Sequence, residues 1–259
     1  METIMCNPIF TDKIDELQLF VYTTRDDMGR SAANQVADCM KALLEKKDII
    51  RMVFAAAPSQ SEFLSTLTRI KDIPWDRVDA FHMDEYIGLE NNASQRFSNF
   101  LKVNLFDIVK PRKVNLLTPN IKEPEVECER YTQLLEEGPI DIICLGIGEN
   151  GHIAFNDPPV ADFKDPQKVK IVELDQMCRQ QQVNDGCFKT IDDVPTHAVT
   201  LTIPTMLSGD NLFCMVPGIN KREAVKNALR GHITTDCPAS ILRTHKKCKF
   251  YVDTNSFPL

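Results

Sequence analysis

Short apolar runs rich in β-branched residues alternate along the chain with longer stretches in which apolar residues recur at helical spacing. The apolar runs, which are typical of buried strands, cover residues 19–23, 50–57, 78–83, 140–147, 198–203, 211–216 and 249–253. The stretches with helical period and length cover residues 26–47, 61–70, 94–106, 126–137 and 221–231. Strands that alternate with helices in this way predict an α/β domain with a largely parallel sheet.

The first helical stretch, residues 26–47, connects the first two predicted strands and carries its apolar residues on one stripe. That stripe consists of Met28, Ala32, Val36, Met40, Leu43 and Leu44. Because such a helix packs one face on a sheet, we predict a crossover helix here. Gly231 is the predicted stop of the last helix, residues 221–231. The chain has no internal repeat, low-complexity linker or charge block, which favours a single domain over residues 1–259.

The composition limits the classes of partner. The chain has 259 residues, 43% of them hydrophobic, and a formal net charge of -7. An acidic protein of this kind is not expected to bind nucleic acid or an anionic membrane surface as its main partner. No apolar stretch is long enough to span a bilayer, and the N-terminal residues lack the pattern of a signal peptide, so we expect a cytoplasmic protein.

Cysteine and histidine spacing gives no sign of a metal site or a disulfide framework. The nine cysteines are scattered, odd in number and never arranged as C-x-x-C, so we expect reduced thiols. The five histidines are also far apart in the sequence. A metal site assembled by the fold stays open, but none is predicted.

Three turn-prone loops directly follow predicted strands, at residues 55–61, 83–89 and 148–158. In open parallel sheets, ligands bind beyond the carboxyl ends of the strands, so we expect the chemistry in these loops. In the second loop, Asp84 and Glu85 place two carboxylates at a strand end, where a carboxylate can face a bound ligand. A solvated turn or a helix cap is the competing interpretation.

The third loop combines glycines with a histidine and an acid. Gly146, Gly148 and Gly151 allow the backbone to approach a ligand closely, and amides exposed in such a turn bind anions. His152 is a candidate proton carrier near neutral pH, with Asp157 close enough in the sequence to orient its ring. A purely structural histidine is the alternative. The glycine spacing does not match a dinucleotide fingerprint, so NAD is not expected.

Two cations suited to a phosphate follow further along the chain. Arg179 lies in a polar segment, and Lys221 stands at the start of the predicted helix 221–231, where amides and the helix dipole favour an anion. Taken singly, each is also explained as an ordinary surface charge.

Four segments, taken in their order and spacing, resemble glucosamine-6-phosphate deaminases, also called glucosamine-6-phosphate isomerases. They are FHMDEYIGL (81–89), LGIGENGHIAFNDP (145–158), PGINKREAVKNALRG (217–231) and PASIL (238–242). The related 6-phosphogluconolactonases share the G-x-G-x-x-G-H core, but the MDEY and HIAFN segments are similar to the deaminases. The resemblance implies a three-layer, Rossmann-like α/β fold of the sugar-phosphate isomerase/deaminase type, a phosphosugar substrate, and no metal or other cofactor.

In such a deaminase, one carboxylate moves a proton between carbon 2 and carbon 1 of the open-chain sugar, and the resulting imine is hydrolysed to a ketose and ammonia. The resemblance assigns this proton transfer to Asp84 and ring opening to His152. It assigns the sugar phosphate to Arg179 and Lys221, together with the loop that contains Ser59. Further expected substrate contacts are Gln60, Glu85 and Gly151.

The chain departs from the family pattern at three positions. Asn150 stands where deaminases commonly have an acid, and the shorter Asp157 stands where they commonly have glutamate; both are expected to act with His152 in catalysis. Pro58 removes one amide donor from the phosphate loop. These changes leave galactosamine 6-phosphate or another phosphosugar open as the substrate, and a sugar-phosphate-binding regulator or a 6-phosphogluconolactonase-like hydrolase open as the function. Bacterial relatives are often homo-oligomers, so a homo-oligomer is a further possibility.

Overall fold

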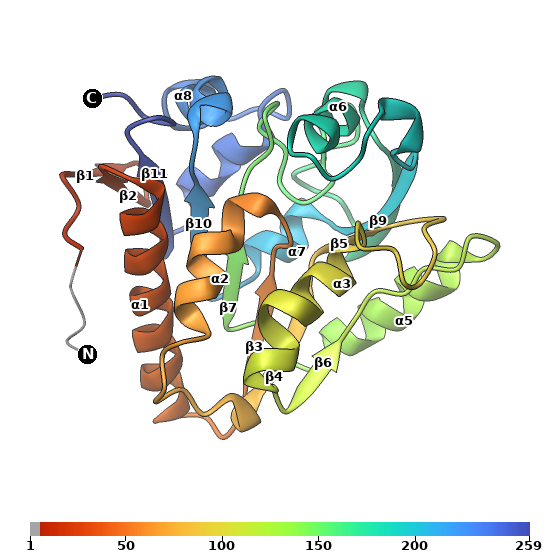
Figure 1. The fold of residues 1–259 in the computed structure, drawn as a ribbon, viewed down its shortest axis with the longest axis horizontal. Helices are drawn as coiled ribbons and strands as arrows, with labels where there is room; N and C mark the ends of the chain where they lie inside the picture. Colours follow the sequence, from red (N-terminus) through yellow and green to blue (C-terminus); the bar gives the residue numbers. More distant parts are fainter. Residues whose placement is uncertain (1–5) are drawn as a thin grey trace.

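The computed structural model describes residues 6–259, which form two β-sheets with helices packed around them (Figure 1). The larger sheet has eight strands in the order β1-β2-β11-β10-β7-β3-β4-β6. Neighbouring strands are parallel, apart from the antiparallel pair β1 and β2. The bounds are β1 (Phe10–Ile14), β2 (Leu17–Tyr22), β3 (Ile50–Phe54), β4 (Val78–His82), β6 (Lys113–Asn115), β7 (Ile142–Leu145), β10 (Asn211–Val216) and β11 (Cys248–Asp253). The prediction of a largely parallel sheet is confirmed.

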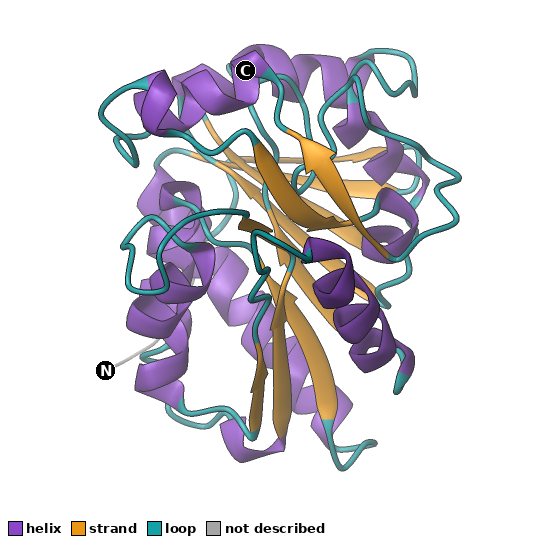
Figure 2. Ribbon diagram, turned by 90° about the vertical axis from the view of Figure 1, so that its right-hand side faces the viewer, coloured by secondary structure: helices purple, strands orange, loops and turns teal. Residues whose placement is uncertain are grey.

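Helices cover both faces of this sheet (Figure 2), because alternate side chains of a strand point to opposite faces. In β10, Phe213 and Met215 join a core that contains residues of α1 and α2, whereas Leu212 and Cys214 join a core that contains residues of α5 and α8. The bounds are α1 (Arg25–Leu44), α2 (Ser61–Leu67), α3 (Phe97–Leu101), α4 (Asp107–Val109), α5 (Pro124–Glu136), α6 (Gln176–Asn184), α7 (Ile203–Leu207) and α8 (Arg222–Arg230). The expected three-layer, Rossmann-like α/β fold is confirmed.

The crossover helix α1 illustrates how the sequence specifies these elements. Its N-cap residue Thr24 accepts a hydrogen bond from the Asp27 amide, and most of the predicted apolar stripe, from Met28 to Leu44, is buried. Burial of each large side chain of this stripe contributes roughly 1.5–3 kcal/mol. Gly231 follows the last residue of α8, as predicted. Among the described residues, no helix combines the length and the hydropathy needed to cross a membrane.

A smaller sheet of three antiparallel strands, in the order β5-β9-β8, was not expected. It consists of β5 (Asp84–Tyr86), β9 (His197–Leu201) and β8 (Val169–Glu173). The apolar run 198–203 therefore supplies a strand to this sheet and not to the parallel sheet. The smaller sheet fixes the chain just beyond the end of β4, because β5 follows β4 directly and pairs with β9.

Candidate active site

A cavity lies beyond the carboxyl ends of β3, β4 and β7, where the three candidate loops meet. Parallel neighbouring strands bring their following loops to the same edge of a sheet. The polar and charged side chains that line the cavity are those of Ser59, Gln60, Asp84, His152, Gln181, Gln182 and Lys221. In the view of Figure 1, α6 and α8 lie beyond this edge of the sheet. The fold therefore gathers side chains that are far apart in the sequence.

Asp84 begins β5 and lies in the cavity wall. The antiparallel pairing of β5 with β9 fixes its backbone opposite Thr200. The residue is only 7% exposed. Burial raises the pKa of the Asp84 carboxyl well above its usual value, and the neighbouring charge of Glu85 raises it further. A carboxylate with a raised pKa is a stronger base, which is the property that removal of a proton from carbon requires.

Glu85 has a different environment from its neighbour Asp84, because its side chain is directed away from the cavity and is fully buried. Its carboxylate accepts hydrogen bonds from the Ser98 hydroxyl (2.6 Å), the Ser98 amide (3.0 Å) and the Phe97 amide (3.1 Å), and it pairs with Arg96 at 3.4 Å. These donors belong to the start of α3. Glu85 therefore positions α3, and the structure gives it no direct contact with the cavity that was expected to hold the substrate.

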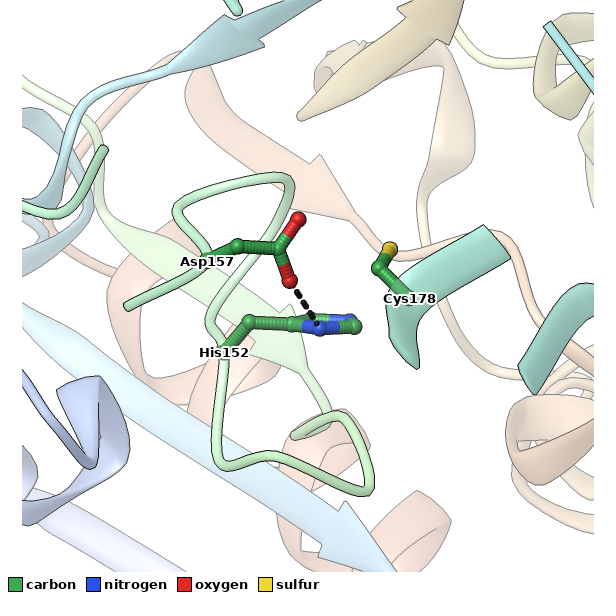
Figure 3. Close-up of side chains that lie close together, drawn as sticks. All are labelled: His152, Asp157 and Cys178. Carbon is green, nitrogen blue, oxygen red and sulfur yellow. Dashed lines mark ion pairs between the residues drawn. The ribbon is translucent and has the colours of Figure 1, made fainter. Parts of the chain in front are cut away.

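His152 lies between two partners that come from its own loop. Its amide donates to Asn150 Oδ1 (3.0 Å), and Asn150 Nδ2 donates to Asp157 Oδ1 (2.9 Å). The same Asp157 oxygen is 2.8 Å from His152 Nδ1, and Figure 3 shows the carboxylate above the imidazole, off the line of an ideal hydrogen bond. Burial raises the pKa of Asp157, but the nearby charge of His152 and the hydrogen bond from Asn150 outweigh it and hold this pKa below its usual value. Asp157 is thus an anion that faces the imidazole.

The backbone of this loop packs directly against the imidazole at Gly148. A Cβ on Gly148 would lie 2.1–2.4 Å from three atoms of the His152 ring. Gly151 has a φ of +81°, which glycine adopts without steric cost. Ala154, in the cavity wall, has a φ of 50°, a conformation that costs a residue with a Cβ about 1–2 kcal/mol. Strained residues persist only where the surrounding structure holds them in place, and they occur most often at functional sites.

We expect Gly148→Ala to reduce turnover, because the added methyl group forces the His152 ring to move. A displacement of about 1 Å in a catalytic group costs on the order of 100-fold in rate. The measurement is kcat of the variant beside that of Gly138→Ala, whose added Cβ meets Arg51 Nη1 at an ordinary 3.4 Å. If both variants keep the parental kcat, the position of the His152 ring does not matter for turnover.

Lys221 supplies the cation of the cavity. It precedes α8 and is 7% exposed, and in the described part of the chain no carboxylate lies within 4 Å of its ammonium group. Burial lowers the pKa of Lys221, although Asp185 and Glu149 act in the opposite direction at longer range. A buried cation without a close anion favours the binding of an anionic group. Ser59 and Gln60 line the same cavity, and Gln60 Oε1 has no hydrogen-bond partner among residues 6–259.

Arg179 does not line this cavity, contrary to the expectation that it faces the sugar phosphate. Its Nη2 donates to the carbonyl oxygens of Ile191 (2.7 Å) and Val194 (2.9 Å), in a neighbouring depression that Asp157 also lines. Gln181 and Gln182 of the same helix line the cavity instead. Sequence reasoning missed these two glutamines, although they stand directly beside Arg179 in the segment RQQQ (179–182).

A family model described as glucosamine-6-phosphate isomerases/6-phosphogluconolactonase matches residues 23–251 of this chain. The chain is 36% identical over 200 residues to glucosamine-6-phosphate deaminase 1 of Giardia intestinalis. This alignment covers 74% of this chain and 72% of that protein. It is 30% identical over 232 residues to the glucosamine-6-phosphate deaminase of Clostridium acetobutylicum, with 88% and 93% of the two chains covered.

Solved structures of the same family have the same fold. A monomeric glucosamine-6-phosphate deaminase superposes with a TM-score of 0.84 and 30% identity, covering 92% of this chain and 98% of its own. A 6-phosphogluconolactonase from Thermotoga maritima has a TM-score of 0.73 at 21% identity, covering 91% and 99% of the two chains, which is a likeness of fold alone. The protein therefore belongs to the family of glucosamine-6-phosphate isomerases and 6-phosphogluconolactonases.

Proposed function

We propose that this protein is a glucosamine-6-phosphate deaminase, which converts glucosamine 6-phosphate and water to fructose 6-phosphate and ammonia. The observation that carries the proposal is the juxtaposition in one cavity of a buried carboxyl with a raised pKa, an imidazole and an unpaired buried cation, namely Asp84, His152 and Lys221. The names of the relatives from Giardia intestinalis and Clostridium acetobutylicum support the same reaction. One chain supplies all three groups. We also propose a cytoplasmic location, as the sequence led us to expect.

The first step is the opening of the sugar ring. His152 takes the proton of the anomeric hydroxyl and returns a proton to the ring oxygen, so the pyranose becomes an open-chain aldehyde. The Asp157 anion and the Asn150 side chain hold the loop and the imidazole in place for this transfer. Asn150 contributes hydrogen bonds but no charge. Of the two side chains that hold the imidazole, only Asp157 therefore carries a negative charge.

The second step moves one proton along the open chain. Ionised Asp84 removes the proton on carbon 2, and the electron pair shifts toward the aldehyde oxygen. A proton of the substrate's ammonium group passes to that oxygen, which gives a planar enolamine. Asp84 then returns a proton to carbon 1, which leaves an iminium group at carbon 2. Water adds to this carbon and ammonia leaves, so the products are a ketose phosphate and ammonia. One carboxylate serves both carbons because they are adjacent and the intermediate is planar.

The phosphate lies at the Lys221 end of the cavity in this proposal. The ammonium group offers charge-assisted hydrogen bonds to phosphate oxygens, and Ser59 adds a hydroxyl donor. The Gln60 and Gln182 amides line the same wall, and in this proposal they donate the hydrogen bonds to the phosphate that the sequence analysis expected from Arg179. An uncharged amide donor in place of an arginine makes the recognition of the phosphate depend mainly on Lys221.

The experiment that tests the proposal is the release of ammonia by the purified protein with three phosphosugars supplied separately. Glucosamine 6-phosphate should release ammonia and yield an equal amount of fructose 6-phosphate. Galactosamine 6-phosphate tests the alternative substrate, and 6-phosphogluconolactone tests the hydrolase alternative. Release of ammonia from galactosamine 6-phosphate alone would move the assignment to that sugar. Hydrolysis of the lactone with no ammonia from either amino sugar would replace the proposal.

The raised pKa of Asp84 predicts how turnover depends on pH. The base acts only when ionised, and its ionised fraction falls as the pH drops through its pKa. Because burial and Glu85 raise that pKa well above 3.8, activity should already decline at a pH well above this value. The measurement is the profile of kcat/KM from acidic to mildly alkaline pH, with the fold monitored by circular dichroism. A flat profile down to the ordinary pKa of an aspartate would contradict the assignment of the base to Asp84.

A further inference from the structure

Behind the imidazole of the candidate active site lies a cysteine that the proposed reaction does not use. Cys178, in α6, places its sulfur close to His152 and Asp157, and the ligand atoms of the three residues all lie within 4.8 Å of one another. Figure 3 shows the sulfur and the carboxylate on the same side of the imidazole. Cys178 is 1% exposed, and it forms no disulfide with any cysteine of the part of the chain that the structure describes. Sequence spacing gave no sign of this group, because α6 brings residue 178 to a loop that ends 20 residues earlier.

The three ligand types form a donor set for a soft divalent cation. Imidazole nitrogen, carboxylate oxygen and thiolate sulfur are the ligands that Zn²⁺ prefers, in tetrahedral geometry. Bond lengths of about 2.0–2.3 Å place such ligand atoms roughly 3.5 Å apart, so small side-chain rotations are enough to bring all three to one ion. The thiolate and the carboxylate together balance the double positive charge. A neutral complex is compatible with a buried site, where an unbalanced charge is costly.

The surface next to this group favours the approach of a cation. Asp157 also lines a neighbouring depression, together with Glu173, Asp175 and Asp192. The guanidinium of Arg179 lies in the same depression, where its Nη2 donates to backbone carbonyls. A surface on which carboxylates outnumber cations raises the local concentration of positive ions.

We propose that His152, Asp157 and Cys178 bind a zinc-like divalent cation reversibly, and that the bound ion inhibits turnover by occupying the imidazole nitrogen and the carboxylate. On binding, the Cys178 S–H bond breaks, its proton leaves to the solvent, and the thiolate becomes a ligand; no electrons are transferred. The binding of the ion stands independently of the proposed function. Its inhibitory effect rests on that function, because it requires His152 to move protons in the reaction.

Cobalt(II) is the probe for binding, since it accepts the same ligands as zinc and absorbs in the near ultraviolet when a thiolate is bound. The full-length protein is titrated with Co²⁺ as wild type, Cys178→Ser and Cys187→Ser. Cys187 is the matched control, a half-buried thiol just after the same helix that is not part of the group. The band should appear in wild type and in Cys187→Ser, be absent in Cys178→Ser, and disappear when Zn²⁺ is added. An equal band in Cys178→Ser, or no band in wild type, would overturn the proposal.

Ammonia release gives the second readout. Cys178 does not line the cavity, so Cys178→Ser should keep its basal kcat, while the Zn²⁺ concentration that halves turnover should rise by about tenfold or more. Equal sensitivity of the two proteins to Zn²⁺ would remove the inhibitory role. If no amino sugar phosphate is turned over, the proposed function fails, and the cobalt band still decides the ion site. Asp157→Asn, which removes a different ligand, replaces Cys178→Ser in the cobalt titration if circular dichroism shows that the serine variant is unfolded.

Discussion

Asp84→Asn is expected to retain phosphosugar binding and to lose turnover by about a factor of 10³ or more. The amide has the shape of the carboxylate but cannot accept the proton from carbon 2, and a positioned general base contributes on the order of 10²–10⁴ in rate. Binding is measured by calorimetry with glucosamine 6-phosphate, and turnover by ammonia release. The loss should lie in kcat, with little change in the dissociation constant, because the interaction is made in the transition state.

The matched control for this prediction is Asp79→Asn, the same substitution near the start of β4. Asp79 pairs with Arg112 at the opposite end of the strand from the cavity, and it does not line the cavity. That variant should lose some stability and keep its kcat. Ammonia release by Asp84→Asn at the parental rate would show that another group is the base.

His152→Gln should reduce turnover of cyclic glucosamine 6-phosphate by about 100-fold and affect an open-chain substrate much less. Glutamine preserves a hydrogen-bonding side chain beside Asp157 but cannot carry a proton, so ring opening is the step that suffers. The comparison substrate is the 4,5-dideoxy analogue, which lacks both hydroxyls that can close a ring. The measurement is the ratio of kcat/KM for the two sugars in wild type and variant.

His197→Gln is the control for this experiment, because His197 is an exposed residue at the start of β9 outside the cavity. It should leave both rates unchanged. Equal losses on the cyclic and the open-chain sugars in His152→Gln would assign the imidazole to a step after ring opening.

The central strands could be predicted because burial on both faces makes them continuous apolar runs. In β10, residues Leu212 to Val216 are all buried, and their side chains alternate between the two cores. The short strand β5 could not be predicted, because its three residues form a strand only by pairing with β9, a tertiary contact. Helix α6 was missed because its sequence, QMCRQQQVN, has almost no apolar stripe.

The positions of the site loops followed from the same reasoning, since the loops after β3, β4 and β7 must meet at one edge of a parallel sheet. The direction of individual side chains did not follow. Asp84 and Glu85 are adjacent in a strand, so they point to opposite sides, and the sequence does not say which of them faces the cavity. Arg179 was misplaced for a similar reason, because the rotation of α6 about its axis depends on packing.

The central claim is that this cavity moves a proton from carbon 2 to carbon 1 of an amino sugar phosphate and then releases ammonia. The most direct test is to incubate the purified protein with glucosamine 6-phosphate in D₂O and to examine the product by NMR. We predict ammonia in an amount equal to fructose 6-phosphate, and any deuterium that Asp84 takes up from the solvent before the transfer should lie on only one face of carbon 1. Absence of ammonia, or fructose 6-phosphate with deuterium spread over both faces of carbon 1, would contradict the account.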